Sequence, residues 1–302
     1  MTLLCWQCAE HLTELESETE SPEILCPNCK TVTPCGEGIY RTLSPLQQAT
    51  FDRFILEYES IRAAEGRGSS HADFYRALPY HDLSGKLASQ WKIRARTFEY
   101  LKHNILPRTP ARILDLGAGN GWLSYRLALR GHTPVAVDLL TNRADGLGAA
   151  HHFPARFPRV QAALDHLPFQ SETFDITVFN ASFHYSENYQ RTLAEALRCT
   201  RKGGMVVIAD TPWYANQSAG LQMVAEKQKR FHSTYGFASN SIASLEFLTP
   251  EYLDSLAVAL NLKWEIHRPF YGLSWSLRPL KAKLLGRRPP SHFRIFVAEV
   301  AA

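Results

Sequence analysis

Asp115 and the glycines that follow it have residue types and a spacing that suit the binding of a small molecule. The segment reads Asp115-Leu116-Gly117-Ala118-Gly119-Asn120-Gly121, directly behind the apolar run Arg112-Ile113-Leu114. Alternate glycines allow positive φ angles and let a ligand lie against the bare main chain. We expect a helix from Trp122, whose first N–H groups would face that ligand. A glycine turn without a ligand is the alternative.

The spacing of these glycines differs from that of a dinucleotide-binding fingerprint. The G-x-G-x-x-G pattern needs a glycine where this chain has Trp122, whose indole would block close packing of helix on strand. The pattern here is D-x-G-x-G-x-G, and a carboxylate at Asp115 suits a cation better than a pyrophosphate. In this form the loop resembles the first motif of the class I S-adenosylmethionine-dependent methyltransferases.

Motifs downstream of the loop strengthen the resemblance. The run Thr133–Asp138 is typical of a buried parallel strand, and Asp138 lies 21 residues beyond Gly117, where a doubly wound fold places the acid that accepts ribose hydroxyls. An L-P-F turn at 167–169, a strand at 174–180, a helix at 188–200, a K-G-G turn and a strand at 205–210 follow in order. Roughly residues 110–210 are thus similar to the core of type 11-like methyltransferases.

The resemblance implies a fold and a set of cofactor contacts. The expected fold is α/β: a Rossmann-like doubly wound sheet, with an antiparallel pair of strands at 263–270 and 293–300. Asp115 would anchor the methionine amino end of S-adenosyl-L-methionine, and Asp138 would take the ribose hydroxyls. The other implied cofactor contacts are Gly117, Ala118, Gly119, Asn120, Gly121, Leu139, Leu164, Asp165 and Asn180.

The adenine contact departs from the family pattern. The family's aspartate four residues before the leucine of L-P-F is replaced here by Ala163. The main chain of Leu164 and the carboxylate of Asp165 are the remaining candidates. A solvated loop acid is the alternative reading of Asp165.

Residues near the end of the strand at 174–180 bear on the methyl acceptor. Asn180-Ala181-Ser182-Phe183 is not the [ND]-P-P-[YF] box of enzymes that methylate exocyclic or amide nitrogens. His184 follows at the expected mouth of the site and is the candidate base for an acceptor hydroxyl, with a packing role as the alternative. The candidate acceptor-pocket residues, each of which also suits packing between helices, are Tyr75, Tyr80, Arg94 or Arg96, Trp213 and Tyr214.

Four of the six cysteines have the spacing of a structural zinc site. Cys5-x-x-Cys8 and Cys26-x-x-Cys29 are separated by 17 residues, and four thiolates close a tetrahedron around Zn²⁺. Two disulfides are the alternative, which a reducing compartment disfavours. We therefore expect a zinc ribbon over residues 1–42. It resembles the ribbon of bacterial ribosomal-RNA guanine methyltransferases and of some small-molecule methyltransferases.

The remaining chain divides into a connector and a methyltransferase domain. We expect a helical connector or lid over residues 43–108 and the S-adenosylmethionine-binding domain over 109–302, with an acceptor insertion at about 211–248. A helix over Pro45–Ala64 is indicated by apolar spacing and by a proline at its first position. The basic stretch 278–288 is interpreted as a solvated loop, or as a contact for a phosphate-bearing substrate.

Composition permits three functional hypotheses. The chain has 302 residues, 45% hydrophobic, and 33 basic against 29 acidic residues, so an anionic partner is permitted but not required. Without a span of apolar residues or a signal peptide we expect a cytoplasmic protein. The first hypothesis is O-methylation of a small-molecule or glycan acceptor that can bear a phosphate. The alternatives are methylation of structured RNA, with the ribbon as RNA contact, and a non-catalytic zinc-ribbon adaptor.

Overall fold

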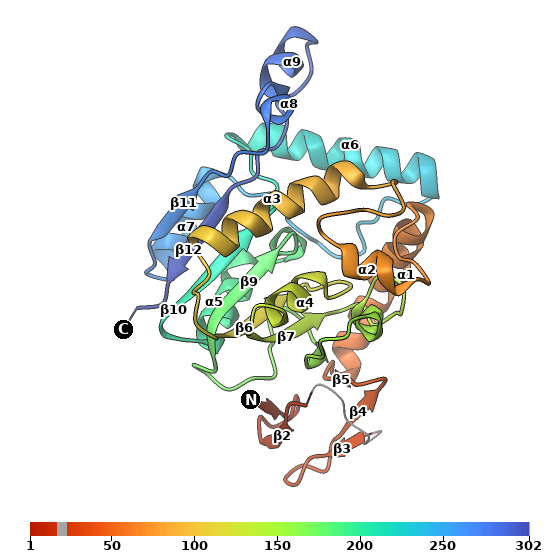
Figure 1. Cartoon of the computed structure of the whole chain (residues 1–302), viewed down its shortest axis with the longest axis vertical. Helices are drawn as coiled ribbons and strands as arrows, with labels where there is room; N and C mark the ends of the chain where they lie inside the picture. Colours follow the sequence, from red (N-terminus) through yellow and green to blue (C-terminus); the bar gives the residue numbers. More distant parts are fainter. Residues whose placement is uncertain (17–22, 302) are drawn as a thin grey trace.

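The centre of the molecule is a twisted sheet with helices on both faces (Figure 1). The structure, a computed structural model, describes residues 1–16 and 23–301; residues 17–22 of the expected ribbon, and residue 302, lie outside it. Ten of the described strands form one sheet, in the order β11-β12-β10-β9-β6-β7-β8-β5-β4-β3. Its core strands are β6 (Arg112–Leu116), β7 (Thr133–Asp138), β8 (Arg159–Gln161), β9 (Phe174–Asn180) and β10 (Thr200–Ala209).

These core strands run parallel, and the chain reverses its direction of progress beside β6. From β6 it moves to β7 and β8 on one side, then crosses to β9 and β10 on the other. In an open α/β sheet, ligands bind at the carboxyl ends of the strands at such a switch point. The strands β12 (Ile295–Glu299) and β11 (Trp264–His267) complete this side as an antiparallel pair. The predicted fold class, including its C-terminal strand pair, is confirmed.

Alternation along the buried strands supplies two hydrophobic cores. Ile113 faces one core and Leu114 the other, as successive residues of a strand must. Helices α3 (Ala88–Asn104) and α4 (Trp122–Ala128) cover the first face, together with α2 (Ala72–Ala77). Helices α5 (Tyr189–Cys199) and α7 (Pro250–Ala259) cover the second. Burial on both faces fixes the ends of the strands, and so the site that they carry.

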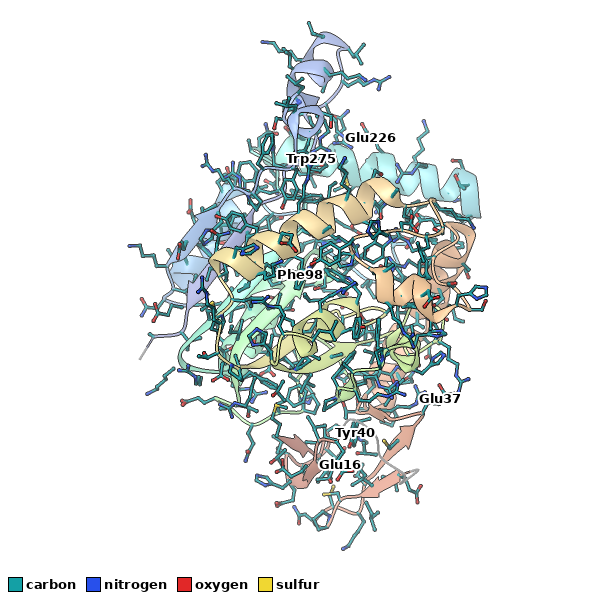
Figure 2. The ribbon with its side chains drawn as sticks, in the orientation of Figure 1. Glu16, Glu37, Tyr40, Phe98, Glu226 and Trp275 are labelled. Atoms are coloured by element: carbon teal, nitrogen blue, oxygen red, sulfur yellow. The ribbon has the colours of Figure 1, made fainter. Side chains whose placement is uncertain are left out.

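The N-terminal segment joins the sheet as well as forming a small unit of its own. Strands β1 (Thr2–Leu4) and β2 (His11–Glu14) pair with each other, while β3 (Glu23–Leu25), β4 (Val32–Gly36) and β5 (Ile39–Arg41) extend the central sheet. β5 pairs in parallel with β8. Tyr40 at this junction is buried, and its hydroxyl accepts a hydrogen bond from the Glu16 main chain at 3.1 Å (Figure 2).

The helices outside the core sheet surround the carboxyl ends of its strands. α1 (Pro45–Ala64) begins at a capping box in which Ser44 and Gln47 bond reciprocally. α6 (Gln217–Tyr235) is capped by Asn216 and ends at Gly236 in the left-handed conformation. Two short 3₁₀ helices, η1 (Leu147–His152) and η2 (Phe183–Tyr185), follow β7 and β9.

The basic stretch expected as a loop is helical. α8 (Leu273–Ser276) and α9 (Arg278–Leu284) project from the body at the end of the molecule opposite the cysteine-bearing strands (Figure 1). Among the described residues, no helix combines the length and the apolar character needed to cross a bilayer.

Candidate active site

The glycine loop between β6 and α4 has the conformation that its sequence predicts. Gly117, Gly119 and Gly121 have φ angles of +73°, +56° and +79°. Residues other than glycine adopt such angles only at a cost in free energy. A Cβ atom on Gly117 would lie 2.2 Å from the Cβ of Ser182. Gly117 therefore allows the loop to lie directly against the segment that follows β9.

The carboxylate of Asp138 is held at the end of β7, facing the loop. Its Oδ2 accepts a hydrogen bond from the Gly119 main-chain N–H at 2.7 Å, and its Oδ1 accepts one from the Leu140 N–H at 2.8 Å. Each carboxylate oxygen keeps a lone pair for a further donor. The sequence separation that singled out Asp138 thus corresponds to direct contact between the carboxylate and the glycine loop.

Asp115 is buried at the end of β6. Its Oδ2 accepts a hydrogen bond from the Ser124 hydroxyl at 2.7 Å. Burial raises the pKa of Asp115 from 3.8 to about 7, with a smaller contribution from the charge of Asp138. A carboxylate buried away from water is stabilised in its ionised form by a cation beside it, because the cation replaces the stabilisation that water would give.

Two further polar residues at strand ends lack partners for buried atoms. Neither the Oδ1 nor the Nδ2 of Asn180, at the end of β9, has a hydrogen-bond partner among the described residues, and the same holds for the Oδ2 of Asp210 after β10. Ala181 and Asp210 also have positive φ angles of 57° and 52°. Unpaired buried polar atoms and strained backbone both concentrate at ligand sites.

These groups line one cavity of about 1070 Å³. Small-molecule sites typically span about 300–1,000 Å³, so there is space for a cofactor and an acceptor together. The predicted residues that line it are Asp115, Gly117, Ala118, Gly119, Asn120, Asp138, Leu139, Leu164, Asn180, His184 and Arg94. Arg96, the alternative to Arg94, lines it too.

Some predicted cofactor and acceptor residues are not in the cavity lining. Gly121 starts α4 behind the loop, where an added Cβ would meet the Phe157 ring at 3.1 Å. Asp165 forms an ion pair with Arg191 at 3.1 Å, as the solvated alternative implies.

The four predicted aromatic acceptor residues make packing contacts elsewhere. The Tyr75 hydroxyl donates to main-chain oxygens and its ring stacks on His152. The Tyr80 hydroxyl donates to Glu99 at 2.7 Å. Trp213 and Tyr214 lie beneath Arg294 and Arg288 respectively. None of the four is in the cavity lining.

His184 does line the cavity, but its surroundings weaken it as a base. Burial lowers the pKa of His184 from 6.5 to about 3, and the positive charges of Lys227 and Arg94 act in the same direction. Its Nδ1 has no partner among the described residues. The imidazole is therefore neutral near pH 7 and a poor proton acceptor, which argues against the catalytic role predicted for it.

The lining of the cavity is predominantly basic, which sequence reasoning only partly anticipated. Six basic residues line the cavity, Arg62, Arg67, Lys92, Arg94, Arg96 and Arg278, against three acidic ones, Asp115, Asp138 and Asp210. Arg94 makes no hydrogen bond or ion pair with any described residue; its guanidinium lies over the Trp91 ring, 5.0 Å from the centroid. Burial lowers the pKa of Arg94, as do the charges of Arg62 and Arg67, while the charge of Asp210 acts in the opposite direction. An unpaired, desolvated cation of this kind suits an anionic ligand.

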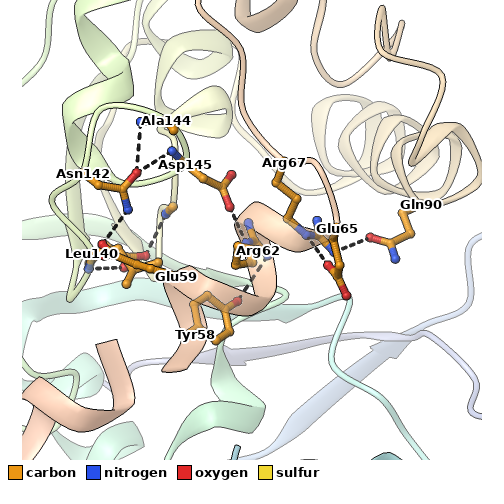
Figure 3. A network of polar contacts seen from close by, with 12 residues as sticks. Tyr58, Glu59, Arg62, Glu65, Arg67, Gln90, Leu140, Asn142, Ala144 and Asp145 are labelled. Atoms are coloured by element: carbon orange, nitrogen blue, oxygen red, sulfur yellow. Dashed lines mark hydrogen bonds and ion pairs between the residues drawn. The ribbon is translucent and has the colours of Figure 1, made fainter. Parts of the chain in front are cut away.

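A polar network ties α1 to the loop after β7 along one side of the cavity (Figure 3). Arg62 forms an ion pair with Asp145 and donates to the Tyr58 hydroxyl at 3.2 Å. Asn142 of the same loop donates to Glu59 at 2.7 Å. The contacts between α1 and this loop join residues 83 positions apart, so no local sequence pattern predicts them.

The four predicted metal ligands come together at the N-terminal end of the molecule. The Sγ atoms of Cys5, Cys8, Cys26 and Cys29 all lie within 4.8 Å of one another, and the Cys5–Cys29 and Cys8–Cys26 pairs are each 3.6 Å apart. Zn–S bonds of about 2.3 Å require tetrahedral S···S edges of about 3.8 Å. No disulfide joins these cysteines. The thiol set therefore fits a zinc ion.

Comparison with known proteins assigns the core. Residues 114–208 match the family described as a methyltransferase domain. This part of the chain is thus a methyltransferase domain. Malonyl-[acyl-carrier protein] O-methyltransferase of Geobacter sulfurreducens is 30% identical to it over 159 residues, covering 51% of this chain and 54% of that protein. Demethylmenaquinone methyltransferase of Thermobifida fusca is 30% identical over 146 residues, covering 44% and 61%.

Solved methyltransferase structures share the fold at low identity. A chain of the Haloferax volcanii complex between the Trm112 methyltransferase activator and a methyltransferase aligns with a TM-score of 0.51 and 15% identity, covering 78% of this chain and 100% of that chain. Haemonchus contortus phosphoethanolamine N-methyltransferase 2, bound to S-adenosyl-L-methionine, aligns at 0.50 and 17%, covering 78% and 60%. These likenesses show the fold alone. The chain spans about half the length of the first curated relative it matches.

Proposed function

We propose that this protein transfers a methyl group from S-adenosyl-L-methionine to an oxygen of a small-molecule acceptor that carries a carboxylate or phosphate. The observation that supports this most strongly is the composition of the cavity. The cofactor-binding groups expected for a methyltransferase core and the unpaired Arg94 line the same cavity. A glycan that bears such an acid belongs to the same acceptor class.

On the cofactor side, we assign each group one task. Asp115 holds the methionine ammonium, Asp138 accepts from the ribose hydroxyls, and the main chain of Leu164 lies against the adenine. The two unpaired atoms of Asn180 bond the methionine end. The bound cofactor supplies an electrophilic methyl group on a sulfonium, so the protein's contribution is to position the acceptor.

On the acceptor side, charge has the leading role. Arg94 binds the acid of the acceptor and holds it against the open face of the glycine loop. A carboxylate is ionised near pH 7 and attacks without losing a proton, so a site whose histidine is a weak base suits it. Two curated relatives are named for methylating malonyl-[acyl-carrier protein] and demethylmenaquinone, which supports a small-molecule acceptor.

A labelled-methyl transfer assay tests this proposal. Fractionated lysate is incubated with the purified protein and methyl-labelled cofactor, with and without prior nuclease treatment. Labelling of products of low mass that survive nuclease is expected, and alkali should release the label where a carboxylate oxygen has been methylated. Loss of all labelled product after nuclease would contradict the proposal and favour an RNA acceptor.

We also propose that Cys5, Cys8, Cys26 and Cys29 hold a structural zinc ion. Four cysteines leave no open coordination position, so the metal would contribute folding energy and take no part in methyl transfer. Elemental analysis of protein purified without chelators should find about one zinc per chain. Protein that is fully folded and zinc-free would contradict this assignment.

A further inference from the structure

The projecting helical segment α8–α9, here called the arm, has one exposed apolar face. Main-chain hydrogen bonds from Leu277 to Leu273, from Lys281 to Leu277 and from Leu285 to Lys281 continue the helical pattern across the boundary between α8 and α9. Leu273, Leu277, Leu280 and Leu284 follow one another at intervals of four, three and four residues, so they share one face. They are 75%, 57%, 56% and 78% exposed.

The charges of the arm lie beside this leucine face. At about 100° per residue, Lys281 falls on one side of the face and Lys283 on the other. Both lysines and Arg287 are exposed, and none of them pairs with a described residue. Residues 266–298 contain seven Lys or Arg and no Asp or Glu, whereas the rest of the chain has 26 basic against 29 acidic residues. The mild positive charge of the protein is therefore concentrated around the arm.

The base of the arm is fixed, and it borders the cavity. The Trp275 ring stacks on Phe293 with centroids 5.2 Å apart, and the Arg278 guanidinium lies 3.1 Å from the Trp275 centroid (Figure 2). Leu273, Trp275 and Arg278 are themselves part of the cavity lining. Whatever contacts the leucine face therefore lies next to the entrance of the acceptor site.

We propose that the arm docks this methyltransferase onto an anionic phospholipid surface. Leucines flanked by lysines match the two layers of such a surface: the leucines enter the acyl boundary and the lysines meet the anionic headgroups. Docking of two copies through this face would bring their cations together with no acid in residues 266–298 to neutralise them. A bilayer with acidic headgroups is complementary to both features.

Docking in this way gives the acceptor a source. The cavity entrance would open toward the lipid, so an amphiphilic acid could pass from the bilayer to Arg94 without crossing water. This last step rests on the proposed function, whereas the docking does not.

Vesicle sedimentation with the full chain tests the docking. Vesicles of phosphatidylcholine alone are compared with vesicles that also contain phosphatidylglycerol. The wild type should sediment only with the anionic vesicles, and added salt should release it. Leu280→Gln/Leu284→Gln should lose the binding, and Lys281→Glu/Lys283→Glu should weaken it by a factor of about ten or more.

Matched controls separate docking from folding and from the proposed function. The double variant Leu221→Gln/Val258→Gln replaces two aliphatic residues outside the arm, on α6 and α7, that are 55% and 85% exposed. Its vesicle binding should therefore equal that of the wild type. Binding of S-adenosylhomocysteine reports on the fold of each variant. Vesicle binding does not require methyl transfer. Failure of the vesicle test and failure of the methyl-transfer assay can therefore be told apart.

Four results would overturn the proposal. The first is a wild type that stays in solution with anionic vesicles, and the second is arm variants that sediment as the wild type does. Light scattering that finds a dimer, converted to monomer by Leu280→Gln/Leu284→Gln, would assign the face to a second copy. Binding to polyglutamate without binding to vesicles would assign it to an acidic protein.

Discussion

Two effects act in opposite directions on the protonation of Asp115. It is buried, which favours its protonated form, and it lies where a cation is expected, which favours its ionised form. The same residue therefore destabilises the free protein and strengthens the complex. Its pH dependence separates these two effects.

Replacing Asp115 with Asn should raise the thermal stability of the cofactor-free protein above pH 7. The folded-state pKa, about 7, exceeds the ordinary value of 3.8, so the folded chain holds this proton more tightly than the unfolded chain. The stability of the wild type should fall between about pH 4 and pH 7, by an amount on the order of a few kcal/mol, and this component should be absent from Asp115→Asn. Thermal melts from pH 4 to pH 8 measure the difference. Parallel curves for the two proteins would refute the burial argument.

A substitution of Arg94 tests the binding of the acceptor, as that of Asp115 tests the cofactor side. Arg94→Met should raise KM for an acidic acceptor about 10-fold to 100-fold, because a charge-assisted hydrogen bond contributes about 1.5–3 kcal/mol. Affinity for S-adenosylhomocysteine should not change, and thermal stability should hold or rise, since an unpaired desolvated charge is removed. Arg53→Met, on the exposed side of α1, is the control. A variant with unchanged acceptor KM would exclude Arg94 from acceptor binding.

At the scale of elements, the cavity depends on contacts between α1 and the loop after β7. The Arg62–Asp145 ion pair is largely buried, with side chains 17% and 8% exposed, so solvent screens it little. It fixes the loop that follows Asp138 against the connector helix (Figure 3). We infer that this contact preserves the shape of the ribose side of the cavity.

A double-mutant cycle on Arg62 and Asp145 tests this contact. Either Arg62→Ala or Asp145→Ala should weaken cofactor binding, and the double variant should lose little more than either single one. The coupling energy should lie at about 1–3 kcal/mol, the upper part of the range for directly interacting residues. Calorimetric titration of each variant gives the four affinities. Additive losses would show that the pair does not act as a unit.

Elements with strong local signals could be predicted from the sequence. α1 was expected at Pro45–Ala64, where it lies, because a first-turn proline and regular apolar spacing agree. The strand at 174–180 and the glycine loop were also predictable, since buried strands and positive φ angles restrict residue type. Asp115 and Asp138 line the cavity because both follow such strands.

Other elements depend on contacts that no local pattern encodes. β8 has three residues and is specified by its neighbours β7 and β5. The basic stretch 278–288 was interpreted first as a solvated loop because it is charged and bounded by prolines, whereas Arg278–Leu284 is helical. Tyr75 and Tyr80 were assigned to the acceptor pocket because aromatic residues near a site suggest binding, but their partners, His152 and Glu99, are known only from the folded chain.

On the scale of the whole molecule, the cysteine cluster and the arm lie at opposite ends of the long axis (Figure 1). The cluster is coupled to the core by β5, which pairs with β8, and by the Leu4 N–H, which donates to Pro168 at 2.9 Å. Loss of the metal should therefore affect more than the N-terminal strands.

Removal of zinc should lower the melting temperature of the entire methyltransferase. Cys26→Ala should lose the metal and expose β5 and β8 to proteolysis, because a closed zinc site contributes folding free energy directly. Cys199→Ala, a buried cysteine outside the cluster, should retain about one zinc per chain even if it is less stable. Elemental analysis with limited proteolysis distinguishes the two. Equal protease resistance with and without metal would contradict the coupling.

The glycine loop and Asp138 together should form the binding site for the cofactor. Calorimetric titration with S-adenosylhomocysteine measures this binding. We expect one site in the wild type and a loss of affinity of about tenfold or more in Asp138→Ala, which lacks the carboxylate proposed to contact the ribose. No binding to the wild type, or equal affinity in Asp138→Ala, would contradict it.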